Sequence, residues 1–199
     1  QGFAITNYHG LFGLYEVPWI LAQLSTVFVF LVIINAINFI DGIDGLAISE
    51  VIKTILLIEF FSTSETELST LTLLLIISLL PLYYFNFKKK DKVFLGDGGS
   101  LLLGTIVSIY IFYVLGEQYT FKAGFQINKV FFVILSILYP LVDLLRVFVL
   151  RIKDGKSPFI ADQRHIHHFL SNKFNSHFKV TLIVITLEIL ITSFYVFIN

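Results

Sequence analysis

Residues Trp19–Ile40 read WILAQLSTVFVFLVIINAINFI, and this stretch decides the fold class. It contains no charged residue and it is long enough to cross a bilayer, which takes about 20 mostly apolar residues. Comparable apolar runs recur along the chain. We expect membrane-spanning helices at about Trp19–Ile40, Leu46–Phe61, Leu68–Phe85, Ser100–Leu115, Val130–Leu150 and Val180–Ile198. The sequence therefore predicts an all-α, polytopic membrane bundle of about six transmembrane helices, with residues 1–199 forming a single membrane domain.

The composition agrees with a membrane protein. Of the 199 residues, 56% are hydrophobic and 14% are charged, against about 45–50% and about 25% in soluble domains. The 14 basic and 14 acidic residues cancel, and this balance argues against a nucleic-acid partner, which needs a basic excess. The chain has no cysteine, which excludes a disulfide framework, a thiolate metal site and a cysteine nucleophile. Membrane lipid is therefore the expected surrounding partner.

The distribution of lysine and arginine predicts which loops face the cytoplasm, because these residues favour cytoplasmic loops. They gather after the third and fifth expected spans, whereas the loops after the second and fourth spans hold only Lys122 and Lys129. We therefore predict that both termini lie outside and that the junctions 41–45, 86–99 and 151–179 face the cytoplasm.

Polar residues concentrate in these same junctions, first at the end of the first span. Asn35, Asn38 and Asp41 follow at intervals of three and so stay near one helix face, and Asp44 comes next. Amides and carboxylates inside a membrane are costly and usually functional. A glycine-terminated helix with asparagines that join helices is the structural alternative, but it does not account for two aspartates.

The second motif, FLGDGGS at 94–100, directly precedes the fourth span. Glycines let the backbone approach a ligand closely, and the N–H groups at a helix start attract phosphate. Asp97 would repel a bare phosphate but would suit a phosphate-bound Mg²⁺, which prefers carboxylate oxygens. An ordinary helix cap by Asp97 or Ser100 is the structural alternative.

The third motif, DQRHIHH at 162–168, combines an arginine with three histidines. His165 and His168 are three apart and are expected to share a helix face. A zinc site, a diphosphate clamp that includes Arg164 and a basic loop on anionic lipid headgroups are the open interpretations. Together with the other two motifs on one membrane face, it favours a site for a nucleotide diphosphate whose second substrate is a lipid.

Three segments resemble the polyprenyl-phosphate N-acetylhexosamine-1-phosphate transferases: NAINFIDGIDGLA at 35–47, VFLGDGGSLLLG at 93–104 and PLVDLLRVFVLRIKDGKSPFIADQRHIHHFL at 140–170. The resemblance implies an Mg²⁺-dependent transferase of the bacterial inner (cytoplasmic) membrane, with its active site facing the cytoplasm. Such an enzyme transfers N-acetylhexosamine-1-phosphate from a UDP-sugar to undecaprenyl phosphate and releases UMP, which initiates lipid-linked cell-envelope polysaccharide synthesis. The His-Ile-His-His form is similar to the branch that uses UDP-N-acetylglucosamine.

The resemblance also implies roles for individual residues. The metal would be held by Asn38 and Asp97, the uracil ring would stack on Phe94, and the base would lie near Asn86. The diphosphate would be held by the histidines and Arg164. The implied catalytic residues are Asp41, Asp44, Asp97, His165, His167 and His168, and the implied substrate-binding residues are Asn35, Asn86, Phe94 and Arg164.

One departure from the family concerns adjacent aspartates in an earlier cytoplasmic loop, because the printed sequence contains no Asp-Asp pair. Since family members have more spans, the resemblance makes this chain the C-terminal portion of a longer enzyme, without the N-terminal spans that carry that loop. We expect this portion alone to be inactive, and a homodimer is a further expectation. The alternative function is a membrane transporter with polar sites at the cytoplasmic face, and a third class is an intramembrane zinc hydrolase that uses the histidines.

Some charged residues are expected to be structural. Asp143 and Arg146 lie three apart in the fifth span and are expected to form an ion pair within the bundle. His177 is expected to be a solvated loop residue. The lysines of 88–92 are expected to reflect topology and attraction to lipid.

Overall fold

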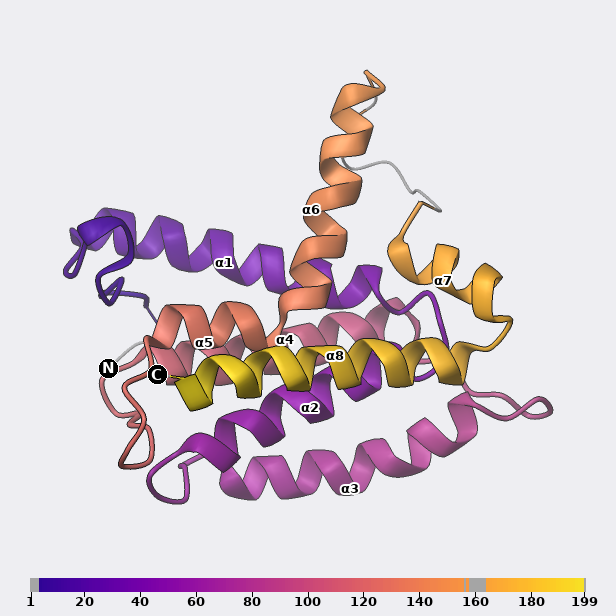
Figure 1. Ribbon diagram of the computed structural model, residues 1–199, viewed down its shortest axis with the longest axis horizontal. Helices are drawn as coiled ribbons and strands as arrows, with labels where there is room; N and C mark the ends of the chain where they lie inside the picture. Colours follow the sequence, from indigo (N-terminus) through magenta and orange to yellow (C-terminus); the bar gives the residue numbers. More distant parts are fainter. Residues whose placement is uncertain (1–3, 156, 158–163, 199) are drawn as a thin grey trace.

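The computed structural model describes residues 4–155, 157 and 164–198, and helices dominate it (Figure 1). The elements are η1 (Leu11–Gly13), α1 (Trp19–Phe39), α2 (Leu46–Phe61), α3 (Ser69–Asn86), α4 (Gly96–Leu115), α5 (Lys129–Ser136), α6 (Leu138–Lys153), α7 (Ile166–Phe174) and α8 (His177–Ile198). Four helices, α1, α3, α4 and α8, are long and apolar enough to cross a membrane, and the bent pair α5–α6 is a fifth candidate. The predicted helical membrane fold is confirmed, whereas the count of about six spans is not.

The helix α2 explains part of the difference in the count. It covers the predicted residues Leu46–Phe61, but its 16 residues reach only about 24 Å, which is less than the hydrocarbon thickness of about 30 Å. It packs against α3, α4 and α8, and Val51, Ile55 and Ile58 on it are fully buried. This helix is therefore mostly buried in the core, although Leu56 and Phe60 on it are exposed.

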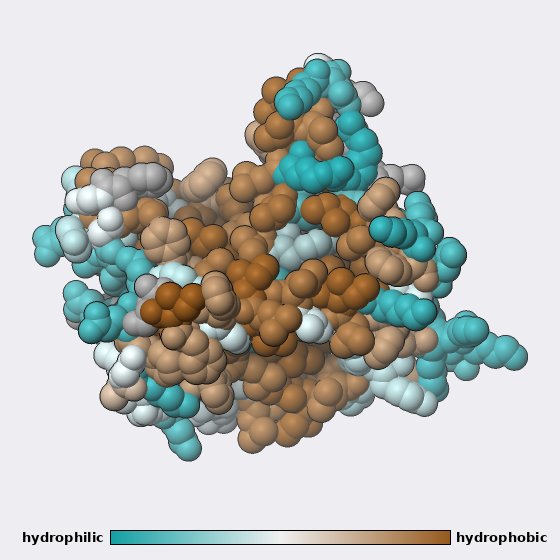
Figure 2. All heavy atoms as spheres, viewed as in Figure 1, coloured by the Kyte–Doolittle hydropathy of each residue, from teal (hydrophilic) through white to brown (hydrophobic). Residues whose placement is uncertain are grey.

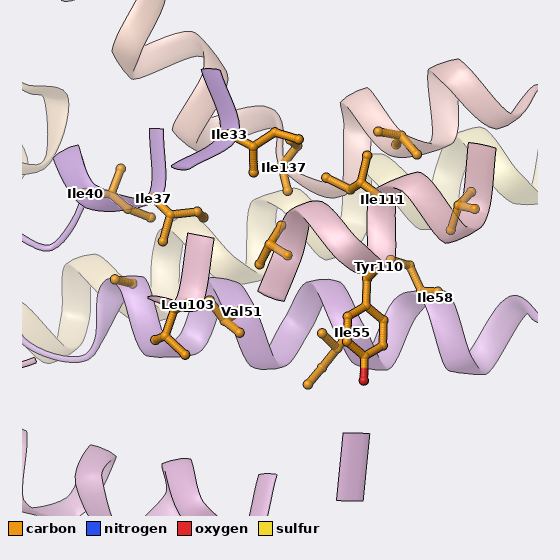
Figure 3. Close-up of a cluster of buried hydrophobic side chains, with 14 of the residues drawn as sticks. Ile33, Ile37, Ile40, Val51, Ile55, Ile58, Leu103, Tyr110, Ile111 and Ile137 are labelled. Atoms are coloured by element: carbon orange, nitrogen blue, oxygen red, sulfur yellow. The ribbon is translucent and has the colours of Figure 1, made fainter. Parts of the chain in front are cut away.

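The core lies where α1, α2 and α4 meet. Figure 3 shows aliphatic side chains from these three helices pointing toward one another, among them Ile37 of α1, Ile55 of α2 and Ile111 of α4. On α4, Gly104 lies so close to α1 that an added Cβ would be 2.7 Å from the Cα of Ile34. Small residues allow membrane helices to approach this closely, and this contact fixes the start of α4 beside the end of α1.

The span expected at Val130–Leu150 is not one straight helix, because two helices, α5 and α6, cover this region and meet at an angle of 75°. The residue between them, Ile137, has φ −128° and ψ 33°, which is not helical. Pro140 suits the first turn of α6, where its missing N–H leaves no helical hydrogen bond unmade. The helix α6 therefore leaves the bundle sideways (Figure 1), with an apolar and a polar side (Figure 2).

The two ends of the bundle differ in what they carry. Both termini lie at one end, and the junctions 40–45 and 87–95 lie with α7 at the other (Figure 1). An apolar band separates hydrophilic side chains at the two ends (Figure 2). The structure thus places the three polar motifs at one end, as the sequence predicts. That this end faces the cytoplasm stays a prediction.

Candidate functional site

Three aspartates gather at this end, and we call Asp41, Asp44 and Asp97 the carboxylate cluster. Asp41 and Asp44 lie in the turn between α1 and α2, whereas Asp97 lies in the first turn of α4. Asn38 joins the two regions, since its Nδ2 donates to Ser100 Oγ at 2.7 Å. Ser100 in turn donates to the backbone oxygen of Asp97 at 3.2 Å. The end of α1 is therefore bonded to the start of α4.

The electrostatics of this cluster favour a bound cation. Burial raises the pKa of Asp41 to about 6, and the charges of Asp97 and Asp44 add to the shift, because each disfavours a further negative charge nearby. A divalent cation among these groups would remove the repulsion. Carboxylate and amide oxygens are ligands that suit Mg²⁺, so Asp41, Asp97 and Asn38 fit this ion.

Asp44 connects the cluster to two other parts of the chain. Its carboxylate pairs with Lys92 Nζ at 2.5 Å and with His177 Nδ1 at 2.9 Å. The prediction that His177 is a solvated loop residue is therefore wrong, since it begins α8 and contacts the site. The Lys92 ammonium also lies 4.8 Å from the centre of the Phe94 ring. That ring is 70% exposed, so it offers an open face at the edge of the site.

Two predicted substrate-binding residues occupy different surroundings. Asn86 is 5% exposed; its Oδ1 accepts from Gly45 N at 2.6 Å and its Nδ2 donates to Val93 O at 2.8 Å. It thus ties the end of α3 to both neighbouring loops. Asn35 donates to Leu31 O of its own helix at 2.7 Å. The structure therefore does not bring Asn35 and Asn86 together, and their roles toward substrate stay predictions.

The histidine cluster, His165, His167 and His168, is arranged differently from the expectation. The prediction that His165 and His168 share a helix face is wrong, because α7 begins at Ile166 and His165 precedes it in an extended conformation. The rings of His165 and His167 stack instead, with centroids 5.3 Å apart. Their Nδ1 atoms lie 2.8 and 3.5 Å from the same carboxylate oxygen of Asp143.

Asp143 is the functional candidate that sequence reasoning missed. It is fully buried, and its second oxygen accepts from Ile166 N at 2.7 Å, so it anchors both histidines and the start of α7. The expected ion pair between Asp143 and Arg146 is not what holds the Asp143 carboxylate in place. Arg146 instead donates to the backbone oxygen of Arg164. An acidic residue within an apolar stretch was the available signal, since such residues are usually functional.

The two clusters meet at Gly42. A Cβ at this position would lie 2.5 Å from His167 Nε2 and 3.3 Å from His168 Cε1, so only glycine lets the turn approach the imidazoles. His167 Nε2 is buried and has no hydrogen-bond partner among the described residues. Burial and the neighbouring His167 and His165 lower the pKa of His168, which favours a neutral ring there.

The remaining parts of the third motif lie further out. Arg164 donates from NH1 to Asp154 Oδ2 at 2.5 Å, on a partly exposed surface beside the end of α6. Residues 162 and 163 of this motif lie outside the described residues.

A groove between α1 and α6 leads to the histidine cluster. It has a volume of about 360 Å³, and apolar side chains such as Leu31 and Leu144 line it together with Asn35 and Arg151. The Arg151 guanidinium lies 5.7 Å from the centre of the Phe39 ring, and that ring lies 5.6 Å from the ring of His165. We call this feature the α1–α6 groove. It joins an apolar surface to the polar site.

Comparisons with known proteins match the first part of the chain. Residues 1–115 match the family model described as glycosyl transferase family 4. The chain is similar to the undecaprenyl-phosphate alpha-N-acetylglucosaminyl 1-phosphate transferases of Pasteurella multocida (36% identity, 54% of this chain, 29% of the relative) and Haemophilus influenzae (37%, 55% and 30%). It is also similar to the decaprenyl-phosphate N-acetylglucosaminephosphotransferase of Mycobacterium leprae (32%, 50% and 26%). The matched segments span less than a third of the length of these relatives.

Proposed function

Because this chain belongs to glycosyl transferase family 4, we propose that the protein transfers N-acetylglucosamine-1-phosphate from UDP-N-acetylglucosamine to undecaprenyl phosphate. The names of its relatives supply the sugar and the polyprenyl acceptor. The product would initiate lipid-linked cell-envelope polysaccharide. The lysines of the 88–92 loop support a site end that faces the cytoplasm, across the bacterial inner membrane.

The observation that carries this proposal is the meeting of three features at one end of the bundle. The carboxylate cluster offers oxygen ligands and the histidine cluster offers ring nitrogens, and Gly42, between Asp41 and Asp44 in the chain, lies against the imidazoles. The α1–α6 groove supplies an apolar surface that ends beside His165 through Phe39. A polyprenyl chain in the groove would bring its phosphate to the same place as a diphosphate on the two clusters.

The reaction needs positioning and charge neutralisation more than covalent help from the protein. An oxygen of the lipid phosphate attacks the β-phosphorus of the donor, and the bond from that phosphorus to the UMP oxygen breaks with its electron pair leaving on UMP. A bound Mg²⁺, held by Asn38, Asp41 and Asp97, would neutralise phosphate oxygens. The histidine cluster would hold the diphosphate, and Phe94 would stack on the uracil ring.

The test is a transfer assay on the full-length natural protein in detergent. We expect UMP and a lipid-linked product from UDP-N-acetylglucosamine, undecaprenyl phosphate and Mg²⁺, and neither of them when the lipid or the metal is left out. UDP-N-acetylgalactosamine serves as the matched donor. Absence of UMP under all conditions contradicts the proposal, whereas a preference for the galactosamine donor corrects only the sugar. The 199 residues alone are expected to be inactive.

A zinc hydrolase is the second candidate, because Asp143, His165 and His167 each offer a ligand atom and these atoms lie within 4.8 Å of one another. Nitrogen-rich donor sets suit zinc better than Mg²⁺. The groove and the carboxylate cluster stay unexplained by this function. Metal analysis of the purified protein distinguishes the two, since stoichiometric zinc favours the hydrolase.

A further inference from the structure

The break between α5 and α6 leaves backbone groups without helical partners in the middle of the bundle. Helix ends have unsatisfied N–H and C=O groups, and inside a membrane such groups are tolerated only where protein or water satisfies them. Two carbonyl oxygens at the end of α5 accept hydrogen bonds from threonine hydroxyls. Thr192 Oγ1 donates to Leu135 O and Thr54 Oγ1 donates to Ser136 O, each at 3.0 Å. Side chains from α8 and α2 therefore cap one side of the break.

On the other side of the break, the cap is a carboxylate. The N–H of Tyr139, in the first turn of α6, donates to Glu188 Oε1 at 2.6 Å. The second oxygen, Oε2, lies 2.9 Å from Lys53 Nζ, and the same ammonium lies 2.6 Å from Glu50 Oε1. These three charged side chains are all buried. Lys53 thus holds Glu188 in the orientation that Tyr139 requires, and it does so from the core helix α2.

Tyr139 connects this cap to the site. Its backbone is bonded to Glu188, and its hydroxyl lies 3.3 Å from His167 Nδ1. Asp143, which contacts His165 and His167, follows Tyr139 by about one helical turn. A shift at the start of α6 would therefore move both the phenol and the carboxylate that orient the histidines.

We propose that Glu188 is a positioning residue that fixes the α5–α6 break by accepting the Tyr139 N–H, and that it thereby sets the place of the histidine cluster. This role in catalysis rests on the function proposed above. Glu188 touches no substrate in this scheme. It acts through Tyr139 and Asp143.

The experiment compares Glu188→Leu with Glu188→Gln in the full-length natural protein. Glutamine retains an oxygen that can accept the Tyr139 N–H, whereas leucine does not. Spin labels at Lys153→Cys on α6 and Lys179→Cys on α8 report the angle of α6, and these 199 residues contain no native cysteine that would take up the label. We expect E188L to broaden the distance distribution and to lower kcat/KM for UMP release about 100-fold, as misplacement of about 1 Å can do. E188Q should restore both readouts to nearly the wild-type values.

Val184→Ala is the matched control, because Val184 is a buried residue of α8 about one turn before Glu188. Equal effects of V184A and E188L overturn the proposal in favour of lost packing. Equal losses in E188Q and E188L overturn it as well. The negative charge that pairs with Lys53, rather than the oxygen that accepts the Tyr139 N–H, would then be what matters. If E188L does not accumulate, Glu188→Ala takes its place, and an unchanged distance distribution for E188A overturns the proposal. The distance measurement needs no turnover, so it decides the role of Glu188 at the break even if the wild-type protein transfers no sugar phosphate.

Discussion

Asp97 and Asp41 belong to the same cluster but have different environments. Asp97 is exposed in the first turn of α4, whereas Asp41 is half-buried between the turn and the other two carboxylates. Asp97 therefore has the more accessible oxygens for a cation and its phosphate ligands. At Asp41, burial and the neighbouring carboxylates raise the pKa. This difference lets two substitutions of the same type give different results.

The substitution Asp97→Asn should abolish Mg²⁺-dependent UMP release. An amide keeps the shape of the side chain but removes a charge that the cation needs, and losses of about 10² to 10³ in kcat are typical when one such electrostatic group is removed. The matched control is Asp91→Asn, an exposed carboxylate of the preceding loop. Retained activity in D97N would remove Asp97 as a metal ligand, and equal loss in D91N would point to a general effect of charge.

Asp41→Asn should stabilise the protein at neutral pH when EDTA removes divalent cations. The pKa of Asp41 is raised from 3.8 to about 6 in the folded protein, so its ionisation penalises folding. The penalty is absent below the lower value and is complete above the higher one. We expect a gain of about 1 to 2 kcal/mol at about pH 7.5 and none at about pH 4, allowing for partial exposure.

Thermal unfolding at the two pH values, with Glu65→Gln as the control, measures this gain. Glu65 is an exposed carboxylate in the loop before α3. A gain in D41N that is the same at both pH values contradicts the electrostatic explanation. Added Mg²⁺ should stabilise the wild type more than the variant, because the variant offers the cation one charge fewer.

At the scale of the element, apolar patterning predicted much of the architecture and missed the sharp bend between α5 and α6. The ends of α1 and α2 agree with the sequence to within one residue, because each mostly apolar segment is bounded by polar or glycine residues. The break at Ile137 escaped prediction since both halves are apolar and the groups that cap it, such as Glu188, lie far away in the sequence. The helix expected at 165–168 begins one residue later, because His165 is extended and α7 starts at Ile166.

For the site too, the sequence predicted positions along the chain but not contacts between distant residues. The three motifs were placed at one end correctly, since each follows or precedes a span. The partners His177 and Asp143 could not be assigned, because a contact between side chains of different helices depends on how those helices rotate and bend. The 75° bend directs Asp143 toward the histidines.

The contact between α4 and α1 leads to a prediction about stability. Gly104→Ala should destabilise the protein by about 1 to 3 kcal/mol, the usual effect of overpacking a core, because the new Cβ would meet the backbone of Ile34 at 2.7 Å. Gly98→Ala, also in α4, has nothing within 4 Å of its added Cβ and should leave the stability unchanged or slightly raised. Thermal unfolding in detergent compares them, and equal stability of the two variants would contradict the close packing.

At the scale of the whole molecule, the α1–α6 groove is connected to the histidine cluster through the contact between the rings of Phe39 and His165. The groove is lined mainly by apolar side chains, and one of them, Phe39, contacts His165. The clusters lie at the end of the bundle that carries α7 and the junction 40–45, one of its two hydrophilic ends (Figures 1 and 2). The proposed sugar donor would therefore bind from the aqueous side and the lipid acceptor from the groove. The KM of each substrate should respond to a different set of substitutions.

Leu144→Trp should raise the KM for undecaprenyl phosphate about tenfold and leave the KM for UDP-N-acetylglucosamine unchanged. Leu144 lines the groove, and an indole there would displace about two CH₂ groups of a bound chain, each worth about 0.8 kcal/mol. Leu145→Trp is the matched control on the same helix, because Leu145 is largely exposed and does not line the groove. A rise in the donor KM, or the same effect from L145W, would count against the groove as the acceptor site.

The 75° bend between α5 and α6 bears on the free energy of binding a water-insoluble substrate. Moving a hydrocarbon chain from a bilayer into water costs about 0.8 kcal/mol for each CH₂ group, so extraction of a whole polyprenyl tail would be prohibitive. Under the proposed function, α6 crosses the direction of its neighbours and borders a mainly apolar groove that would open to the lipid tails. Under the proposed function the tail stays among lipids throughout, and only the phosphate has to reach the aqueous boundary.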